Sequence, residues 1–281
     1  MAATKWIHVT SRVSLATPDL CAEDTGGWLW EHMREAFPEP LAVVLMPDHP
    51  HLVLAHDDPA ACERRLTRLL GQFGRRFGVD GQIGLGASAS PILADKLDRN
   101  LRYALLNPCR AGLVRCPLAW PFSTHRDVVG AIVRPWVTAP RLARALETPL
   151  SGFVVRHHAY VSADPSARVD GTPFSVAATP RALPNVALRT IAEAVAAALR
   201  VPIEAIRSRG AARSLFVALA CEQGWDHPTK LAEVCRVQAR AIPALARGAD
   251  PRALAAARLC LGDARLRALP ATRRQPAKRS A

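Results

Sequence analysis

The spacing of apolar residues predicts a strand, a helix and two further strands at the start of the chain. Residues 7–13 alternate between apolar and polar side chains and are rich in β-branched residues, which is typical of a β-strand. Residues 24–37 repeat their apolar side chains at helical spacing. Residues 41–45 form an apolar run of strand length, and Pro47 and Asp48 predict a tight turn into another strand. The expected order is therefore β-α-β-β.

A basic helix is predicted next, followed by a glycine-rich stretch. Asp58 precedes a proline, and an aspartate cap with proline at the first helical position is a helix start signal. We expect this helix to continue to about Phe77, with leucines facing inward and arginines facing outward. The glycines of residues 78–90 lack the lysine and hydroxyl residues of a phosphate-binding loop, so we expect a loop or a decayed strand there.

A second amphipathic helix is predicted over residues 94–107. Leucine recurs at every fourth position from Leu93 to Leu105, which defines a face that packs on a core. Tyr103 lies on another face of this helix, and Asn107 follows it by one turn, so their side chains are expected to point the same way. The proline directly after Asn107 is expected to end the helix.

The second half of the chain is predicted to be helical, after a proline-rich linker at residues 164–187. Residues 231–235 and 238–247 predict two short helices joined by a turn near Arg236, which is the arrangement of a helix-turn-helix motif. Pro243 falls about five residues into the second of these helices, where we expect it to kink or shorten the helix.

Composition and charge add a partner to this picture. The chain has 281 residues, 49% of them hydrophobic, which is enough for one large domain or two ordinary domains with buried cores. The formal net charge is +13, and +12 of it lies in residues 139–281. Positive charge concentrated in one half indicates a polyanionic partner, with nucleic acid as the first candidate.

Cysteine spacing and apolar run lengths exclude several other classes of protein. Seven cysteines are scattered without a Cys-x-x-Cys pair, which argues against a zinc ribbon and against a disulfide scaffold. No run of about eighteen apolar residues could cross a bilayer, and the N-terminal residues lack the apolar core of a signal peptide. We therefore expect a cytoplasmic protein with no membrane partner.

Two histidines stand at the start of the third predicted strand. If that strand begins at His49, the alternation of side chains places His49 and His51 on the same face, at the spacing of metal ligands. The alternative is a pair of hydrogen-bonded histidines on an exposed strand face. His8 on the first strand is expected to face the open side of the sheet, with a place beside the pair as the alternative.

Three motifs, in this order, resemble the REP-associated tyrosine transposases and related single-tyrosine HUH transposases. Residues 46–52, Met-Pro-Asp-His-Pro-His-Leu, resemble the family's Met-Pro-Asn-His-x-His-Leu strand. Residues 103–113, Tyr-Ala-Leu-Leu-Asn-Pro-Cys-Arg-Ala-Gly-Leu, resemble its Tyr-x-x-x-Asn-Pro-x-Arg-Ala-Gly-Leu helix end. Residues 120–130 resemble its Trp-Pro-Trp-Ser-Ser-x-Arg-x-x-x-Gly segment. The resemblance extends over the first half of the chain.

The resemblance implies an α+β fold of ferredoxin-like type, with an antiparallel sheet and helices on one face. It implies that Tyr103 is the nucleophile and that His49, His51 and Asn107 are ligands of Mg²⁺ or Mn²⁺. The implied activity is a single-stranded DNA nickase and transesterase, in which the tyrosine forms a 5′-phosphotyrosine link that a 3′-hydroxyl reverses. Single-stranded or hairpin DNA would be the partner of a monomer or a homodimer.

Arginines that could contact the DNA backbone lie on the two helices of the first half and in the helix-turn-helix region. They are Arg64, Arg68, Arg75, Arg99, Arg102, Arg110, Arg236 and Arg240. The alternative for each of them is an ordinary solvated face.

The predicted division of the chain has five parts. They are an HUH transposase-like domain at 1–130, a helical extension at 131–163, a linker at 164–187, a helical DNA-binding domain at 188–269 and a basic tail at 270–281. The helical domain resembles the DnaA-type or resolvase-like domains that are appended to some transposase relatives.

Three departures from the family pattern leave alternatives open. Pro50 removes a hydrogen bond from what should be a central strand, Asp48 replaces the usual asparagine, and residues 82–90 lack the family's tryptophan and arginine. One alternative is a non-catalytic DNA-binding regulator derived from a transposase. Another is a metal hydrolase that uses the histidine pair with water, which would leave Tyr103 without a role.

Overall fold

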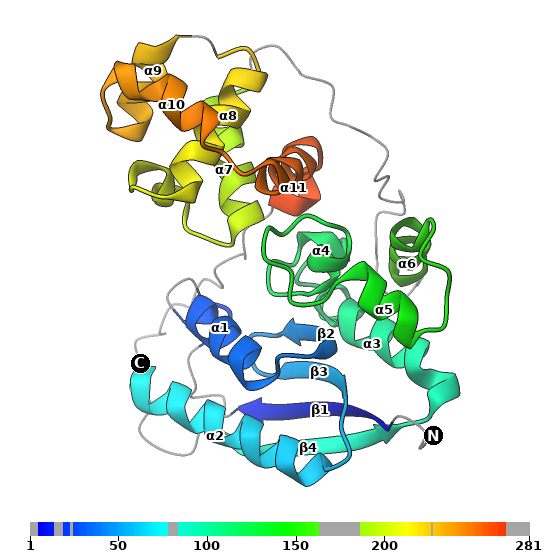
Figure 1. The fold of residues 1–281 in the computed structure, drawn as a ribbon. Helices are drawn as coiled ribbons and strands as arrows, with labels where there is room; N and C mark the ends of the chain where they lie inside the picture. Colours follow the sequence, from blue (N-terminus) through cyan, green and yellow to red (C-terminus); the bar gives the residue numbers. More distant parts are fainter. Residues whose placement is uncertain are drawn as a thin grey trace.

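The computed structural model describes residues 5–13, 19–22, 25–77, 84–162, 186–225 and 227–267. Within them an antiparallel sheet with its helices is followed by an all-helical part, so the fold is α+β (Figure 1). The predicted linker lies almost entirely, and the predicted basic tail entirely, outside the described residues. No helix among the described residues is long and apolar enough to cross a membrane.

One four-stranded sheet organises the first half of the chain. Its strands are β1 (Trp6–Val13), β2 (Pro40–Leu45), β3 (Pro50–Ala55) and β4 (Gly84–Ile92). Their spatial order is β2-β3-β1-β4, and every neighbouring pair is antiparallel. α1 (Gly26–Ala36) connects β1 to β2, and α2 (Pro59–Phe77) connects β3 to β4. The predicted β-α-β-β order is confirmed, and α2 and β4 complete it.

β4 stands where a loop or a decayed strand is expected from the glycine-rich sequence, and for residues 84–90 the loop expectation is wrong. β4 pairs with β1 along its length, from Ile92 opposite Trp6 to Gly84 opposite Val13. β4 is an edge strand, and edge strands tolerate a proline such as Pro91 because they pair on one side only. Pairing with β1 therefore decides the conformation of this segment, against its weak intrinsic preference for a strand.

Pro50 is accommodated by its position at the start of β3. It is the first residue of the strand and lies opposite Leu45 of β2, so its missing N–H falls at the strand end. Its carbonyl oxygen accepts a hydrogen bond of 2.8 Å from the hydroxyl of Thr10 on β1. The proline therefore leaves the rest of the central strand paired on both sides.

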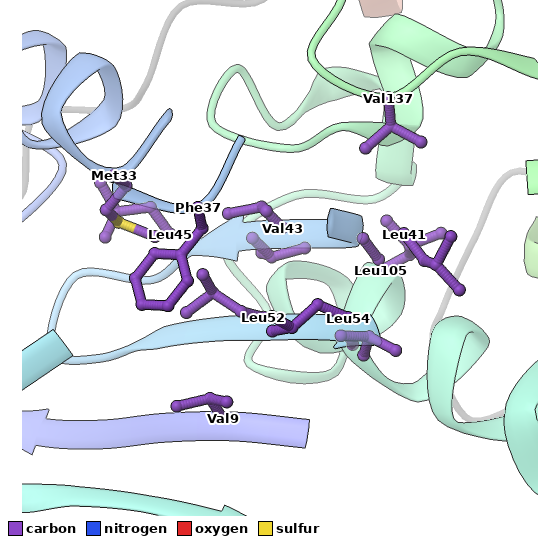
Figure 2. Close-up of a cluster of buried hydrophobic side chains, with 14 of the residues drawn as sticks. Val9, Met33, Phe37, Leu41, Val43, Leu45, Leu52, Leu54, Leu105 and Val137 are labelled. Carbon is purple, nitrogen blue, oxygen red and sulfur yellow. The ribbon is translucent and has the colours of Figure 1, made fainter. Parts of the chain in front are cut away.

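The alternation of side chains gives the sheet two different faces. Val9 and Leu52 lie opposite each other on one face, in a cluster that includes Met33 and Phe37 from α1 and its C-terminal cap (Figure 2). α2 packs beside α1 in the same layer. The other face carries His51 and is covered by α3 (Leu97–Arg110), which packs on β2 and β3. Helices thus lie against both faces, so the expectation of helices on one face is wrong, because α3 covers the face that carries His51.

α3 differs from its predicted helix at both ends. Leu97, Leu101 and Leu105 are buried as predicted, but Leu93 precedes the helix and is 66% exposed. Pro108 does not end α3, which continues to Arg110. A proline in the last turn removes only one hydrogen bond of the helix, so the chain can complete the turn.

The remaining helices form the second half and its connection to the sheet. They are α4 (His125–Val128), α5 (Ala139–Ala145), α6 (Phe153–Ser162), α7 (Leu188–Leu199), α8 (Ala211–Glu222), α9 (Pro228–Cys235), α10 (Ile242–Arg247), α11 (Pro251–Gly262) and α12 (Ala264–Arg267). Figure 1 shows α7 to α11 gathered on the far side of α4 from the sheet. Cys116, Leu118, Val129 and Ala131 from before α5 share a core with them, so the two halves pack together.

The expected kink at Pro243 is absent. α9 ends at Arg236, whose φ of 53° is left-handed, and a short 3₁₀ turn (Ala239–Ala241) precedes α10. Because α10 begins at Ile242, Pro243 occupies its first turn, where the missing N–H would have no helical partner. The expected interior position was wrong because the second helix starts later than its apolar pattern indicates.

Arg200 joins the helical half to the sheet half. It caps α7 in the left-handed conformation, with φ of 55°. Its guanidinium donates to Asp127 Oδ1 at 2.7 Å and to the carbonyl oxygens of Pro121 and Ser123. The same group lies over the ring of Trp30, 4.6 Å from its centroid. One side chain therefore contacts both α1 and the segment that leads into α4.

We expect Arg200→Met to lower the free energy of unfolding by about 3 kcal/mol, because it leaves the buried Asp127 carboxylate without its cation. The measurement is urea denaturation followed by circular dichroism. Arg189→Met, on the same helix, removes an exposed pair with Glu193 and should cost less than about 0.5 kcal/mol. Equal losses in the two variants would contradict a specific role for Arg200.

Three buried histidines lie between α4 and α6. His125 Nε2 is 2.9 Å from His158 Nδ1, and the ring of His157 lies 5.4 Å from that of His125. Burial lowers the pKa of His157 to about 4 and that of His158 to about 4, and it holds the pKa of His125 well below its ordinary value. All three are therefore neutral in the folded protein at neutral pH.

The free energy of unfolding should fall as the pH drops from about 6.5, the pKa of histidine in the unfolded chain, towards about 4. In this window the histidines bind protons in the unfolded chain but stay neutral in the folded protein. Each histidine adds up to about 1.4 kcal/mol per pH unit to the slope in this window. The measurement is urea denaturation at a series of pH values. His157→Phe should make the slope shallower, and replacement of the exposed His227 by Gln should leave it unchanged.

Candidate active site

His51 occupies the centre of the sheet, on the face that α3 covers. It lies opposite Thr10 of β1 on one side and opposite Val44 of β2 on the other. Its side chain is 5% exposed, whereas His49, in the turn before β3, keeps 20% of its side chain exposed. The predicted placement of both histidines on one face is confirmed by the contact between their rings, whose centroids are 4.6 Å apart.

A chain of short contacts links three histidines and one carboxylate. His8 Nε2 lies 2.9 Å from His51 Nδ1, and His51 Nε2 lies 2.9 Å from His49 Nε2. His49 Nδ1 in turn lies 2.7 Å from Asp48 Oδ1. In both His49 and His51 the Nδ1 atom therefore contacts a neighbour, Asp48 and His8 respectively, and the Nε2 atoms of the two rings face each other.

Proton counting restricts what can lie between these two Nε2 atoms. The Asp48 carboxylate accepts, so His49 Nδ1 carries its hydrogen and the neutral ring has a lone pair at Nε2. If His51 donates its own hydrogen to His8 from Nδ1, two lone pairs face each other at 2.9 Å, which is favourable only with a cation between them. Two ligands about 2.1 Å from one octahedral cation and at about 90° to each other are separated by about 3 Å. The pair therefore fits a cation; the alternative is that the hydrogen of His51 lies on Nε2 and is donated to His49.

The electrostatics keep the central imidazole neutral. Burial, together with smaller effects of the neighbouring His49 and His8, lowers the pKa of His51 to about 3. Burial also lowers the pKa of His8. Neutral imidazole is the form that binds metal ions, so this part of the site needs no deprotonation at neutral pH.

Tyr103 lies beside the histidines. Its ring centroid is 6.0 Å from that of His51 and 6.4 Å from that of His8, and both pairs of rings are nearly perpendicular. The side chain is 45% exposed, and the guanidinium carbon of Arg110 lies 5.4 Å from its ring centroid. α3 thus places a phenol with access to solvent next to a buried imidazole.

Asn107 is half-buried one turn after Tyr103, and its contact is with its own helix. Its amide Nδ2 lies 3.4 Å from the carbonyl oxygen of Ala104. In a regular helix this oxygen would accept from the N–H of residue 108, which Pro108 lacks. This contact leaves the amide oxygen as an acceptor. None of the hydrogen bonds among the described residues joins Asn107 to His49 or His51.

His8 is the site residue that sequence reasoning missed, because the expectation that it simply faces the open side of the sheet is wrong. The alternation along β1 puts His8 on the face that carries Thr10, and Thr10 lies opposite His51. His8 itself lies opposite Val53, and its ring stacks on that of His51 at a centroid distance of 5.0 Å. The missing information was the register between β1 and β3.

The predicted DNA-contacting arginines fall into three groups. Arg99 and Arg110 are exposed on α3, whereas Arg102 is half-buried with its guanidinium carbon 4.7 Å from the ring centroid of Tyr160 on α6. The exposed arginines outside α3 are Arg64, Arg68 and Arg75 on α2, and Arg236 and Arg240 in the helical half. Those on α2 lie across the sheet from Tyr103, so a single DNA strand at Tyr103 would not contact all eight.

The donor set of the site is poor in acidic groups. Among the described residues, no group of three or more His, Cys, Asp or Glu side chains is arranged to hold a metal ion. A cation at the His49 and His51 pair would therefore need other ligands, such as an amide or a phosphate oxygen. Comparison of the chain with known protein families, with curated proteins and with solved structures finds no match.

Proposed function

We propose that the chain is a metal-dependent single-stranded DNA nickase and transesterase of the single-tyrosine HUH transposase type. The observation that carries this proposal is the position of the Tyr103 ring, 6.0 Å from that of His51, whose Nε2 lies 2.9 Å from His49 Nε2. A phenol and two imidazoles thus meet on one face of the sheet, which supports the roles that the resemblance implies for them.

The topology of the sheet half supports the same proposal. The order β-α-β-β-α-β, with the strand order β2-β3-β1-β4, supports the proposed ferredoxin-like fold, for which this order of elements is expected. The helix-turn-helix part of the proposal rests on α9 and α10, which pack together across the left-handed turn at Arg236. Because α10 has only six residues, a recognition helix would also have to use the 3₁₀ turn before it.

Mg²⁺ or Mn²⁺ would be held by His49 and His51, with the amide oxygen of Asn107 as third ligand and the DNA phosphate completing the set. The bound cation would supply Lewis acidity that withdraws negative charge from the phosphate oxygens. Asp48 and His8 contact the outer nitrogens of the two imidazoles, and such contacts fix the orientation of a ligand and raise its basicity.

The covalent step uses the phenol of Tyr103. Its oxygen attacks phosphorus and the bond to the 3′-oxygen of the neighbouring nucleotide breaks, so the strand ends as a 5′-phosphotyrosine and a 3′-hydroxyl. The phenol loses one proton and the leaving oxygen gains one. Attack by a 3′-hydroxyl on the phosphotyrosine reverses these changes and rejoins DNA without an external source of energy.

A DNA-binding regulator without catalysis is the second candidate. The contact of Asn107 with Ala104, rather than with the histidines, favours it, because the third ligand is not assembled with the other two. A metal hydrolase is disfavoured because Tyr103, beside His51, would have no role.

Incubation of the protein with single-stranded hairpin oligonucleotides and Mn²⁺ should give a covalent adduct, which denaturing gel electrophoresis detects as a shifted band. Tyr103→Phe should abolish the adduct, because phenylalanine has no oxygen to attack phosphorus. Tyr160→Phe is the matched control: it removes the other tyrosine, whose hydroxyl bonds to Asp98, and should leave the adduct unchanged.

Three results would separate the candidates. An adduct that requires Tyr103 supports the transesterase. Binding of the hairpins without cleavage supports the regulator, and cleavage that persists in Tyr103→Phe supports the hydrolase.

Mn²⁺ affinity tests the ligand assignment without catalysis. In a Tyr103→Phe background with hairpin DNA present, His51→Ala should abolish specific Mn²⁺ binding, measured as free Mn²⁺ by electron paramagnetic resonance. His8→Ala should weaken it by about 10- to 100-fold, which is typical for loss of a group that orients a ligand. His56→Ala, directly after β3 and at the opposite end of that strand from His49, is the control and should leave it unchanged. Equal affinity in all variants would contradict the assignment.

A further inference from the structure

A surface hollow lies between α1 and α2, on the side of the sheet away from Tyr103. Its lining side chains come from two adjacent helices and combine aromatic rings with cations: Trp28, His32, Gln72, Arg75 and Arg76. None of these five side chains is acidic. Arg75 is one of the predicted DNA-contacting arginines, but none of the five lies at the candidate active site, so the hollow is a separate location.

The spacing of these residues explains why they meet. Trp28 and His32 are four residues apart on α1, and Gln72, Arg75 and Arg76 are three or four apart on α2. Residues at these spacings share one face of a helix, so each helix turns one short row towards the other. The hollow is therefore a property of two regular helices and not of a loop.

Trp28 lies outside the buried stripe of α1 and is only partly covered. The helix buries Leu29, Trp30 and Met33, whereas Trp28 is half-buried on the flank next to α2. Phe77 meets its ring edge-on at a centroid distance of 5.7 Å. The contact with Phe77 thus fixes the position of the indole, and part of the indole surface remains accessible to a ligand.

His32 covers part of one face of the indole, so the two rings form a stacked pair, and it has a fixed tautomer. Its ring stacks on Trp28 with a centroid distance of 3.8 Å and an angle of 26° between the planes. Its Nδ1 lies 2.8 Å from the carbonyl oxygen of Trp28, which can only accept, so Nδ1 carries the hydrogen. Nε2 of the neutral ring is left as a hydrogen-bond acceptor.

The opposite wall supplies positive charge and hydrogen-bond donors. The guanidinium carbon of Arg76 lies 5.7 Å from the ring centroids of both Trp28 and Phe77. Arg75 and Gln72 are exposed beside it. A guanidinium matches a phosphate in charge and in the geometry of its N–H groups, and the glutamine amide offers both a donor and an acceptor.

We propose that this hollow is a nucleotide-binding site that takes a nucleobase with its adjoining phosphate. The base would stack on the Trp28 and His32 surface, with His32 Nε2 and Gln72 beside its polar edge, and the phosphate would contact Arg75. Stacking on aromatic side chains beside a cationic wall is the chemistry by which proteins hold single-stranded nucleic acid. The same chemistry suits a free nucleotide, so both sources are tested.

The test measures binding of fluorescently labelled oligothymidylate and of an abasic phosphodiester of the same length by anisotropy. Trp28→Leu should weaken oligothymidylate binding about tenfold and leave binding of the abasic strand unchanged, because only the bases stack. Arg75→Ala should weaken binding of both. Arg65→Ala is the matched control, since Arg65 is exposed on the same helix, donates a hydrogen bond to the carbonyl oxygen of Ala36 and does not line the hollow.

Thymidine monophosphate as a competitor separates the two sources. If the monophosphate displaces oligothymidylate at equal nucleotide concentration, the hollow takes a free nucleotide. If it does not, the hollow takes a single strand. Both outcomes support the hollow as a nucleotide site. Wild-type affinity for oligothymidylate in both Trp28→Leu and Arg75→Ala would overturn it. So would an equal loss for the abasic strand in Trp28→Leu.

Thermal unfolding checks that Trp28→Leu still folds, and the exposed Arg75→Ala keeps the test valid if it does not. The result is also independent of the catalytic proposal. A lost adduct in Tyr103→Phe concerns the other face of the sheet, whereas the base-dependent loss in Trp28→Leu is measured as binding, without any adduct.

Discussion

The antiparallel register of β3 between β1 and β2 is the constraint on which the rest of the structure depends. It sets Thr10 opposite His51 and so brings His8 within 2.9 Å of the central imidazole. Side chains alternate with a period of two, so a shift of one residue would turn His51 to the opposite face, which α1 and α2 cover. The apolar residues that face those helices fix the register, because a slip would turn Leu52 away from the apolar cluster and place the imidazole of His51 within it.

Much of the sheet half can be predicted from local sequence, and what cannot be predicted depends on pairing. The two histidines, the tyrosine and the first strands follow from alternation and helical spacing, which act within a few residues. β4 and the role of His8 follow from contacts between segments far apart in the chain. Residues 84–90 alternate leucine or alanine with glycine or serine, but these small residues have a weak preference for a strand, and pairing with the edge of β1 decides their conformation.

Pro50, Pro108 and Pro243 show that the effect of a proline depends on how far it lies from the end of its helix or strand. Pro50 and Pro243 are harmless because each stands at the start of its element, and Pro108 because it stands in the last turn of α3. The cost of a proline depends on whether its missing N–H had a partner, and this changes within two residues of an end. Sequence patterns place element ends less accurately than that, so the expected damage at Pro108 and Pro243 was wrong although the prolines themselves are plain in the sequence.

Asn107 and Pro108 are adjacent in the sequence, and the proline affects how the Asn107 side chain is oriented towards the proposed metal site. Pro108 has no N–H, so the Ala104 carbonyl loses its helical donor, and Asn107 Nδ2 lies 3.4 Å from that oxygen. An amide whose nitrogen faces its own helix must present its oxygen away from it. On the helix that carries Tyr103, this turns an acceptor outward one turn from the phenol. If Asn107 is the third ligand of the proposed site, the proline beside it is part of what orients it.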